Sequence, residues 1–247
     1  MLKLLNPAIC AALIGCLLTI PFSKGKGQSV QRGGNDTVLV NKLSLLCKKM
    51  RHIAPNFTQS GIISITDESA KDHQTDDLGF MFCKQGNEFY YKLGKAIMLN
   101  ENGLYLYIDL RNKTILISPQ KKVVYDIGFK QFADVAATVR SENYKISSTE
   151  SGNEQTISVV NEHHITCKQY ALSFDKRNMK INKLYMRLTN INDPLRTDNE
   201  KIISATISRW DDTADLGAFL TAGKVVNNIK GRWVLTGEFK NYQLISM

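Results

Sequence analysis

The residue types that usually carry out catalysis are few in this chain of 247 residues, and they do not form a known motif. Two of the four histidines, His163 and His164, are adjacent at the predicted start of a strand. Adjacent side chains of a strand point to opposite faces, so this pair cannot bind one metal ion. A nucleophile elbow, a phosphate-binding loop and a dinucleotide fingerprint are all absent from the sequence. We therefore predict no catalytic residue, no metal and no cofactor, and expect a protein that is not an enzyme.

The carboxylates and thiols lead to the same expectation. The segment WDDTAD, residues 210–215, gathers three aspartates but lacks the glycine and the spacing of a calcium loop. It is interpreted as a solvated capping loop. Cys47, Cys83 and Cys167 are odd in number and far apart, which is not the pattern of a disulfide framework. One disulfide between two of them, or three buried thiols, are both compatible with the sequence.

The N-terminus has the layout of a secretory signal. Lys3 precedes an apolar run over residues 4–22, and small and basic residues follow up to Gly27. Pro7 and Pro21 leave an apolar length shorter than the ~20 residues needed to span a bilayer. We predict a signal peptide over 1–27, a flexible leader over 28–35, and export to the periplasm of a Gram-negative bacterium. LIGC, ending at Cys16, resembles a lipoprotein processing box, so an outer-membrane lipoprotein is the alternative.

The charge of the chain is moderately basic. The formal net charge is +9, and removal of residues 1–27 takes away three lysines and no acid, leaving +6. The densest basic segments, residues 47–52 and 119–124, are short. This distribution is compatible with transient contact with an anionic membrane surface. It lacks the basic stripe and module of a nucleic-acid-binding protein, so no nucleic-acid partner is expected.

The pattern of apolar residues predicts a sheet with little helix. An N-terminal cap at Asp36 and apolar spacing of three and four indicate a helix up to about residue 52. Between Gly61 and Tyr125 the pattern alternates with period two through seven short strands. A second helix is predicted over 128–141, followed by five strands and a final strand pair. Short connections favour antiparallel pairing, so we predict an α+β, mostly antiparallel β single domain over 36–247.

Each predicted strand has one apolar and one wetter face. Leu104, Leu106 and Ile108 share one face, whereas Tyr105 and Tyr107 share the other. Two short helices can cover only part of an apolar sheet face made by about twelve strands. The remaining apolar surface is either packed on itself, as in a filled barrel, or available to a ligand, and the pattern alone favours neither.

Segments YYKLGKAIMLNENGLYLYIDLRNKTILIS and WVLTGEFKNYQLI, with the helix after VVY, resemble the periplasmic lipoprotein-carrier (LolA/LolB-like) superfamily. The likeness extends over residues 36–245, and it is closest to uncharacterised exported members of Gram-negative bacteria. It implies an open, incomplete β-barrel of about 11–12 strands covered by two or three helices, with a cavity for acyl chains. Carriers latch the covering helix with a strand arginine, but Arg187 and Arg209 have no flanking motif that identifies them.

The leading hypothesis is therefore a carrier that shields a hydrophobic ligand, such as an acyl chain, a lipid or a lipoprotein. The residues expected to form the cavity wall are apolar strand residues and one tryptophan: Leu104, Leu106, Ile108, Ile115, Ile117, Leu184, Met186, Leu188 and Trp210. The alternative hypothesis is an envelope interaction or assembly protein of the same fold with a packed interior.

Overall fold

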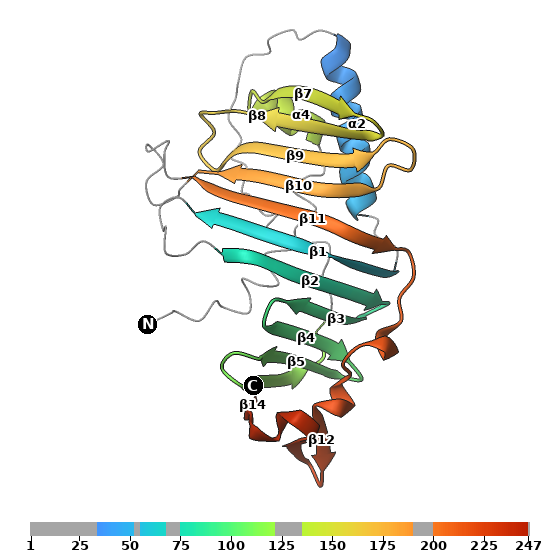
Figure 1. Cartoon of the computed structure of the whole chain (residues 1–247), viewed down its shortest axis with the longest axis vertical. Coiled ribbons are helices and arrows are strands. Elements are labelled where there is room, and N and C mark those ends of the chain that lie inside the picture. The colour runs from blue at the N-terminus through green and yellow to red at the C-terminus, as the bar shows by residue number, and fades with distance from the viewer. Residues whose placement is uncertain (1–33, 52–54, 68–74, 122–134, 190–199, 247) are drawn as a thin grey trace. The chain divides into compact units, whose positions relative to one another are not determined.

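The computed structural model describes residues 34–51, 55–67, 75–121, 135–189 and 200–246, so the predicted signal peptide lies outside the described residues (Figure 1). The chain packs as two compact units. Among the described residues, unit 1 comprises 34–51, 62–67, 75–77, 135–189 and 200–207, and unit 2 comprises 55–61, 78–121 and 208–246. No described helix has the length and apolar composition needed to cross a membrane.

The strands form one large open sheet with mostly antiparallel pairing, which confirms that part of the prediction. Their hydrogen-bonded order is β14-β6-β5-β4-β3-β2-β1-β11-β10-β9-β8-β7. The predicted half-barrel is wrong: the described strands form one open sheet of twelve, whose end strands, β14 and β7, each have one neighbour in this order. The parallel pairing of β14 (Gln243–Ser246) with β6 (Thr114–Pro119) was not predicted either. Local spacing reveals hairpins, whereas this pair joins segments far apart in the sequence.

Among its described residues, unit 1 contains two helices and one end of the sheet. Its helices are α2 (Gly34–Arg51) and α4 (Val135–Ser141). Its strands are β7 (Lys145–Ser151), β8 (Glu154–Val160), β9 (Cys167–Asp175) and β10 (Ile181–Leu188), with the first part of β11 (Lys201–Asp211). Parts of β1 (Asn56–Asp67) and β2 (Thr75–Gln85) also belong to it. His163 and His164 precede β9 in a turn, so the predicted strand starts later than expected.

Helix α2 begins two residues before the predicted cap, and Asp36 lies in its first turn, where it complements the helix dipole. The spacing of the sequence predicts a face made of Val38, Leu39, Lys42, Leu45, Leu46 and Lys49, but the helix buries a different one. The buried residues are Val40, Leu43, Leu46 and Cys47, whereas Val38 and Leu45 are exposed. Apolar residues occupy more than one side of this helix, and only its contacts decide which side is covered. Figure 1 shows α2 running across β7–β10 on one face of that part of the sheet, consistent with its contacts to β7.

Unit 2 consists of a meander and a C-terminal segment. The meander continues from β2 through β3 (Glu88–Leu93), β4 (Ala96–Glu101), β5 (Leu104–Asp109) and β6. The segment ENG, residues 101–103, lies between two alternating runs and predicts a hairpin turn. The structure confirms it, because Asn102 and Gly103 have the positive φ angles of a two-residue hairpin turn. The C-terminal segment contains η3 (Leu216–Ala218), η4 (Ala222–Lys224), β12 (Val226–Ile229), β13 (Arg232–Leu235), η5 (Gly237–Asn241) and β14.

Candidate functional site

The predicted wall residues of unit 2 lie together on one sheet face. Leu106 pairs with Ile117, and Ile108 pairs with Ile115, across β5 and β6. These four side chains are 0–2% exposed, and Leu104 is partly buried beside them. The same cluster extends to β4 through Ile97 and Leu99. The structure therefore brings all five of these residues into one apolar surface.

The C-terminal segment of the chain covers this surface. Leu216, Ala222, Val225, Val226 and Phe239 belong to the same buried cluster. The sequence predicts an irregular segment over residues 212–224 and a strand pair after it. It does not predict a cover, because apolar residues without periodicity do not indicate which surface they contact. An apolar ligand on this surface would have to displace residues 216–239. In unit 2, the apolar strand surface that helices leave uncovered is thus covered by the C-terminal segment.

Specific polar contacts hold the C-terminal segment in place. The carboxylate of Glu101, which is buried, accepts a hydrogen bond from the backbone N–H of Ala222. Near the start of the segment, the hydroxyl of Thr58 donates to the carbonyl oxygen of Thr213 at 2.9 Å. The ring of Phe219 stacks on Tyr90 with 4.8 Å between centroids. These contacts fix the segment at several points, so it behaves as an integral part of the core.

The opposite face of the meander is less solvated than the alternating pattern predicted. Tyr91 and Tyr105 were expected on a wet outer face, but each is at most 5% exposed. Tyr91 packs edge-on against Phe82, and Phe82 packs edge-on against Phe57, with centroid distances of 5.7 and 5.1 Å. The ammonium group of Lys121 lies 4.0 Å from the centroid of the Tyr105 ring. Tyrosines bury their rings readily, so a tyrosine in an alternating pattern does not identify the solvent face.

In unit 1, the remaining predicted wall residues except Trp210 lie on β10, on the sheet face that carries Phe174. Leu184 pairs with Leu172 and Ala205, and Met186 pairs with Tyr170 and Ile203. Met186 is fully buried, whereas Leu184 and Leu188 on the same face of β10 are only partly buried. Trp210 lies in the part of β11 that belongs to unit 2 and is partly buried. The nine residues are therefore divided between two units.

The contact between α2 and the sheet includes a charged side chain. The ammonium group of Lys42 lies 5.1 Å from the centroid of the Phe174 ring and donates to the side-chain oxygen of Gln155. Phe174 and Gln155 are both buried and are paired across β8 and β9. Lysine stems commonly cover apolar surface while the ammonium group keeps polar contacts. The interface between helix α2 and the sheet is therefore not fully apolar, because it includes the Lys42–Gln155 contact.

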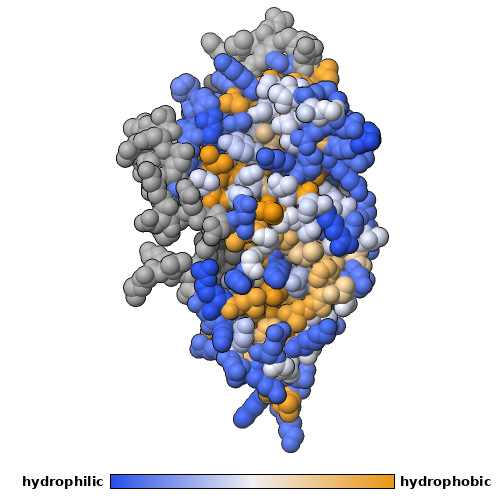
Figure 2. Space-filling view, viewed as in Figure 1, coloured by the Kyte–Doolittle hydropathy of each residue, from blue (hydrophilic) through white to orange (hydrophobic). Residues whose placement is uncertain are grey.

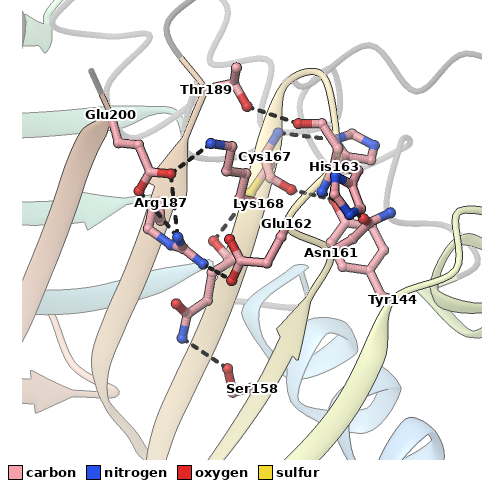
Figure 3. A network of polar contacts seen from close by, with 12 residues as sticks. Tyr144, Ser158, Asn161, Glu162, His163, Cys167, Lys168, Arg187, Thr189 and Glu200 are labelled. Carbon is pink, nitrogen blue, oxygen red and sulfur yellow. Dashed lines mark hydrogen bonds and ion pairs between the residues drawn. The ribbon is translucent and has the colours of Figure 1, made fainter. Parts of the chain in front are cut away.

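The densest group of charged side chains in unit 1 joins β9, β10 and the start of β11 (Figure 3). The carboxylate of Glu200 accepts from the Lys168 ammonium group at 2.7 Å and from the Arg187 guanidinium group at 3.2 Å. Arg187 also pairs with Glu162, a contact that lowers the pKa of that carboxyl group. Lys168 and Glu200 are nearly buried. A buried charge requires partners, so each charge here depends on the others.

A second polar group surrounds His164, which sequence reasoning set aside. The ring Nδ1 of His164 accepts from the backbone N–H groups of Thr166 and Cys167 at 3.2 and 3.0 Å. Nδ1 therefore carries no proton, and Nε2–H donates to the Glu142 carboxylate at 2.9 Å. Burial lowers the pKa of His164, and protonation of Nδ1 would also oppose both N–H donors. Burial raises the pKa of Glu142 to about 7.

Cysteine, histidine and glutamate meet here, but their geometry is not that of a nucleophile and its base. The Cys167 thiol donates to the carbonyl oxygen of Gln169 at 3.3 Å, and His164 contacts the Cys167 backbone. Burial raises the pKa of Cys167 to about 12, so this sulfur remains a thiol. The hydroxyl of Tyr144 donates to the Cys167 carbonyl oxygen at 2.6 Å, and burial raises the pKa of that phenol. These contacts stabilise the turn that precedes β9.

The remaining reactive groups are the three thiols and the side chains that could bind a metal ion. Cys47, Cys83 and Cys167 are buried thiols with no disulfide among them, which decides between the two readings of the sequence. Among the described residues, no group of three or more histidine, cysteine, aspartate or glutamate side chains is arranged to hold a metal ion. Neither the Lys168–Glu200 pair nor the Glu142–His164 pair was predicted. Their members are scattered singly along the sequence, so only the strand pairing brings them together.

Comparison with known proteins gives no family assignment. No protein-family model and no curated protein matches the chain. Similar solved structures include an uncharacterised conserved protein from Thermus thermophilus, with 5% identity, a TM-score of 0.39, and coverage of 86% of this chain and 99% of that one. A DUF1329 family protein from Desulfovibrio piger has 8% identity, a TM-score of 0.25, and coverage of 73% and 93%.

A third similar structure is described as an outer membrane lipoprotein-sorting protein domain from Vibrio parahaemolyticus. It has 8% identity, a TM-score of 0.23, and coverage of 69% of this chain and 90% of that one. Identities and TM-scores at this level assign neither a ligand nor a function to the chain.

Proposed function

We propose that the chain is an exported envelope protein that binds an acyl chain or a lipid on the sheet face of unit 1 beneath helix α2. The observation that carries the proposal is that the described residues cover this face incompletely. Leu184 and Leu188 are only partly buried, and α2 places the Lys42 ammonium group over Phe174. The signal-like N-terminal sequence supports export of the chain.

The C-terminal cover of unit 2 and helix α2 of unit 1 differ in what a ligand must displace. Residues 216–239 cover the unit 2 face with five buried apolar side chains and with the hydrogen bond from Ala222 to Glu101. When α2 moves, water can replace the Lys42–Gln155 contact at a net cost of about 1 kcal/mol, and the ligand must replace the apolar contacts of Val40, Leu43, Leu46 and Cys47. An acyl chain would then bury apolar area against Leu184 and Met186, worth ~25 cal/mol per Å² before the costs of binding.

Native mass spectrometry of protein purified from the periplasm tests the proposal directly. The expected result is a bound fatty acid or phospholipid, which delipidation removes and added oleate restores. Leu184→Glu places a carboxylate on the proposed surface at a partly buried position, so oleate affinity should fall about tenfold or more. Ile245→Glu, at an exposed position of unit 2, is the matched control and should leave oleate affinity unchanged.

Lys42→Met tests whether α2 is the element that moves. An apolar side chain of similar length completes the apolar contact with Phe174, so the covered state should become more stable and oleate should bind more weakly. Lys48→Met on the exposed side of the same helix is the control. A ligand on this face would be excluded if the purified protein never carries lipid and if neither Leu184→Glu nor Lys42→Met changes its oleate affinity.

A second function is favoured by the packing of unit 2. Its predicted wall residues form a closed core, the arrangement expected for an envelope interaction or assembly protein that binds no lipid. Cross-linking in the intact envelope separates the two functions. A reproducible protein partner with no lipid on the purified protein supports assembly, whereas bound lipid that depends on Leu184 supports the carrier.

A further inference from the structure

The hairpin of β12 and β13 exposes two aliphatic side chains on the same face. Ile229 is 55% exposed and Val234 is 44% exposed. In the register of the hairpin Asn227 pairs with Val234, and Ile229 pairs with Arg232, so these four side chains share the outward face. Figure 2 shows hydrophobic atoms between hydrophilic ones at the end of unit 2 where Figure 1 labels β12. Exposed aliphatic groups held close together indicate a contact surface.

The inward face of the hairpin fixes its position. Val226 is buried in the core cluster, and Trp233 and Leu235 pack against that cluster. At the base of the hairpin, the backbone N–H of Thr236 donates to the carbonyl oxygen of Val225 at 2.9 Å. The outward face is therefore presented by an element that is anchored in the core.

The tip of the hairpin is a tight two-residue turn. Lys230 and Gly231 have φ angles of 53° and 82°, which match the right-handed twist of a hairpin. The backbone N–H of Gly231 donates to the side-chain oxygen of Asn228 at 2.8 Å. These contacts hold Ile229 in one place, so little conformational entropy is lost when this residue contacts a partner.

The charges around the exposed pair are nearly all positive. Lys230 and Arg232 flank Ile229, and both are exposed. Lys224 and Lys240, at the ends of η4 and η5, are also exposed. The hairpin itself, residues 226–235, contains no aspartate or glutamate, and Glu238 is the one acid within 224–240. Residues 224–240 therefore attract an anionic partner along their whole length.

We propose that the outward face of the β12–β13 hairpin docks on an anionic lipid surface. Ile229 and Val234 would enter the boundary between headgroups and acyl chains, while Lys230 and Arg232 would contact lipid phosphates. An aliphatic pair flanked by cations fits the two layers of a lipid surface, apolar inside and anionic outside. This surface does not depend on the acyl-chain site proposed for unit 1, because it uses a separate set of residues.

Vesicle co-sedimentation tests the proposal with protein produced with its own N-terminal sequence in a Gram-negative host. The N-terminus is defined by mass spectrometry and is identical in all variants. The probes are vesicles of phosphatidylcholine alone and vesicles of phosphatidylcholine with about 30% phosphatidylglycerol, which have an anionic surface. Binding is expected to the anionic vesicles only, and it should weaken at high salt.

Variants assign the binding to the hairpin. Lys230→Gln with Arg232→Gln should reduce the partition coefficient about 25-fold, since each cation near the surface contributes about fivefold. Ile229→Ser with Val234→Ser should reduce it about tenfold through lost apolar insertion. The controls remove equivalent groups from unit 1: Arg177→Gln with Lys180→Gln, and Ile62→Ser with Ile165→Ser, all at exposed positions. Far-UV circular dichroism verifies that each variant is folded.

Several results would overturn the proposal. These are equal binding to neutral and anionic vesicles, no binding to either, or equal losses in the hairpin variants and the controls. A protein partner that cross-links to the hairpin in place of lipid would also overturn it. The hairpin variants should retain oleate binding by unit 1, so failure of the lipid-surface proposal is distinguishable from failure of the carrier proposal.

Discussion

The titration of Glu142 gives the sharpest test of the structure. Its side chain is 11% exposed and accepts a hydrogen bond from neutral His164, and burial raises its pKa from about 4.5 to about 7. A raised carboxyl pKa means that the folded state holds the proton more tightly than the unfolded state. The free energy of unfolding contributed by this group is therefore highest below pH 4.5 and is lost as pH rises through 7.

Glu142→Gln removes this titration and keeps an oxygen that accepts from the Nε2–H of His164. A pKa difference of about 2.5 corresponds to about 3.4 kcal/mol, and contact with solvent reduces the expected effect to about 1–2 kcal/mol. The variant should match the wild type near pH 4.5 and exceed its free energy of unfolding by about 1–2 kcal/mol at pH 8. The lowered pKa of His164 gives a contribution of the opposite sign, present above pH 6.5, and the measured difference therefore reports the coupled Glu142–His164 pair.

Urea unfolding at half-unit steps between pH 4.5 and 8, followed by far-UV circular dichroism, measures the effect. Glu162→Gln is the matched control, because Arg187 lowers the pKa of Glu162 and the dependence has the opposite sign. Its contribution is present above the unfolded pKa and is lost on acidification, so the control variant should be the less stable protein at pH 8. A Glu142→Gln protein that is less stable than the wild type at pH 8, or a difference independent of pH, would refute this reasoning.

Three further predictions concern packing and buried polar groups, each measured as a change in the free energy of unfolding by urea titration at pH 7. Leu106→Ala creates a cavity at a 0% exposed position and should cost about 2–5 kcal/mol. The control Ile62→Ala, at a 45% exposed position, should cost less than about 1 kcal/mol. Equal losses would contradict the packed core of unit 2. Asn100→Ala removes three hydrogen bonds of 2.8–3.0 Å to backbone groups and should cost about 2–3 kcal/mol; a neutral effect would mean that water replaces them. Glu200→Gln leaves the buried Lys168 ammonium group without its carboxylate and should cost about 3–5 kcal/mol, and recovery in a double variant with Lys168→Met would confirm that the penalty comes from the unpaired charge.

The strands and turns were largely predictable because their signals are local. Period-two alternation located β3–β6, and the Asn102-Gly103 turn determined the register of β4 against β5. Alternation also placed Leu106 and Ile108 on a common face, and the structure confirms this. The same reasoning placed Tyr91 and Tyr105 on a solvated face, where it was wrong, because a tyrosine ring is stabilised by burial as readily as by exposure.

The candidate sites were less predictable because they depend on contacts between distant segments. Glu142 and His164 are 22 residues apart, and Lys168 and Glu200 are 32 residues apart. No spacing rule connects such residues. The outward face of the β12–β13 hairpin became recognisable only when the burial of Val226 and Trp233 showed which side of the hairpin faces the core.

The sequence by itself determined where strands, turns and the first helix form and which side chains share a face, since these properties follow from backbone geometry over a few residues. Tertiary structure decided what covers each face. In unit 2 the cover is the C-terminal segment, whose apolar residues have no period, and in unit 1 it is the side of α2 that carries Lys42. Both choices depend on the free energy of burial summed over distant segments, which no local pattern contains.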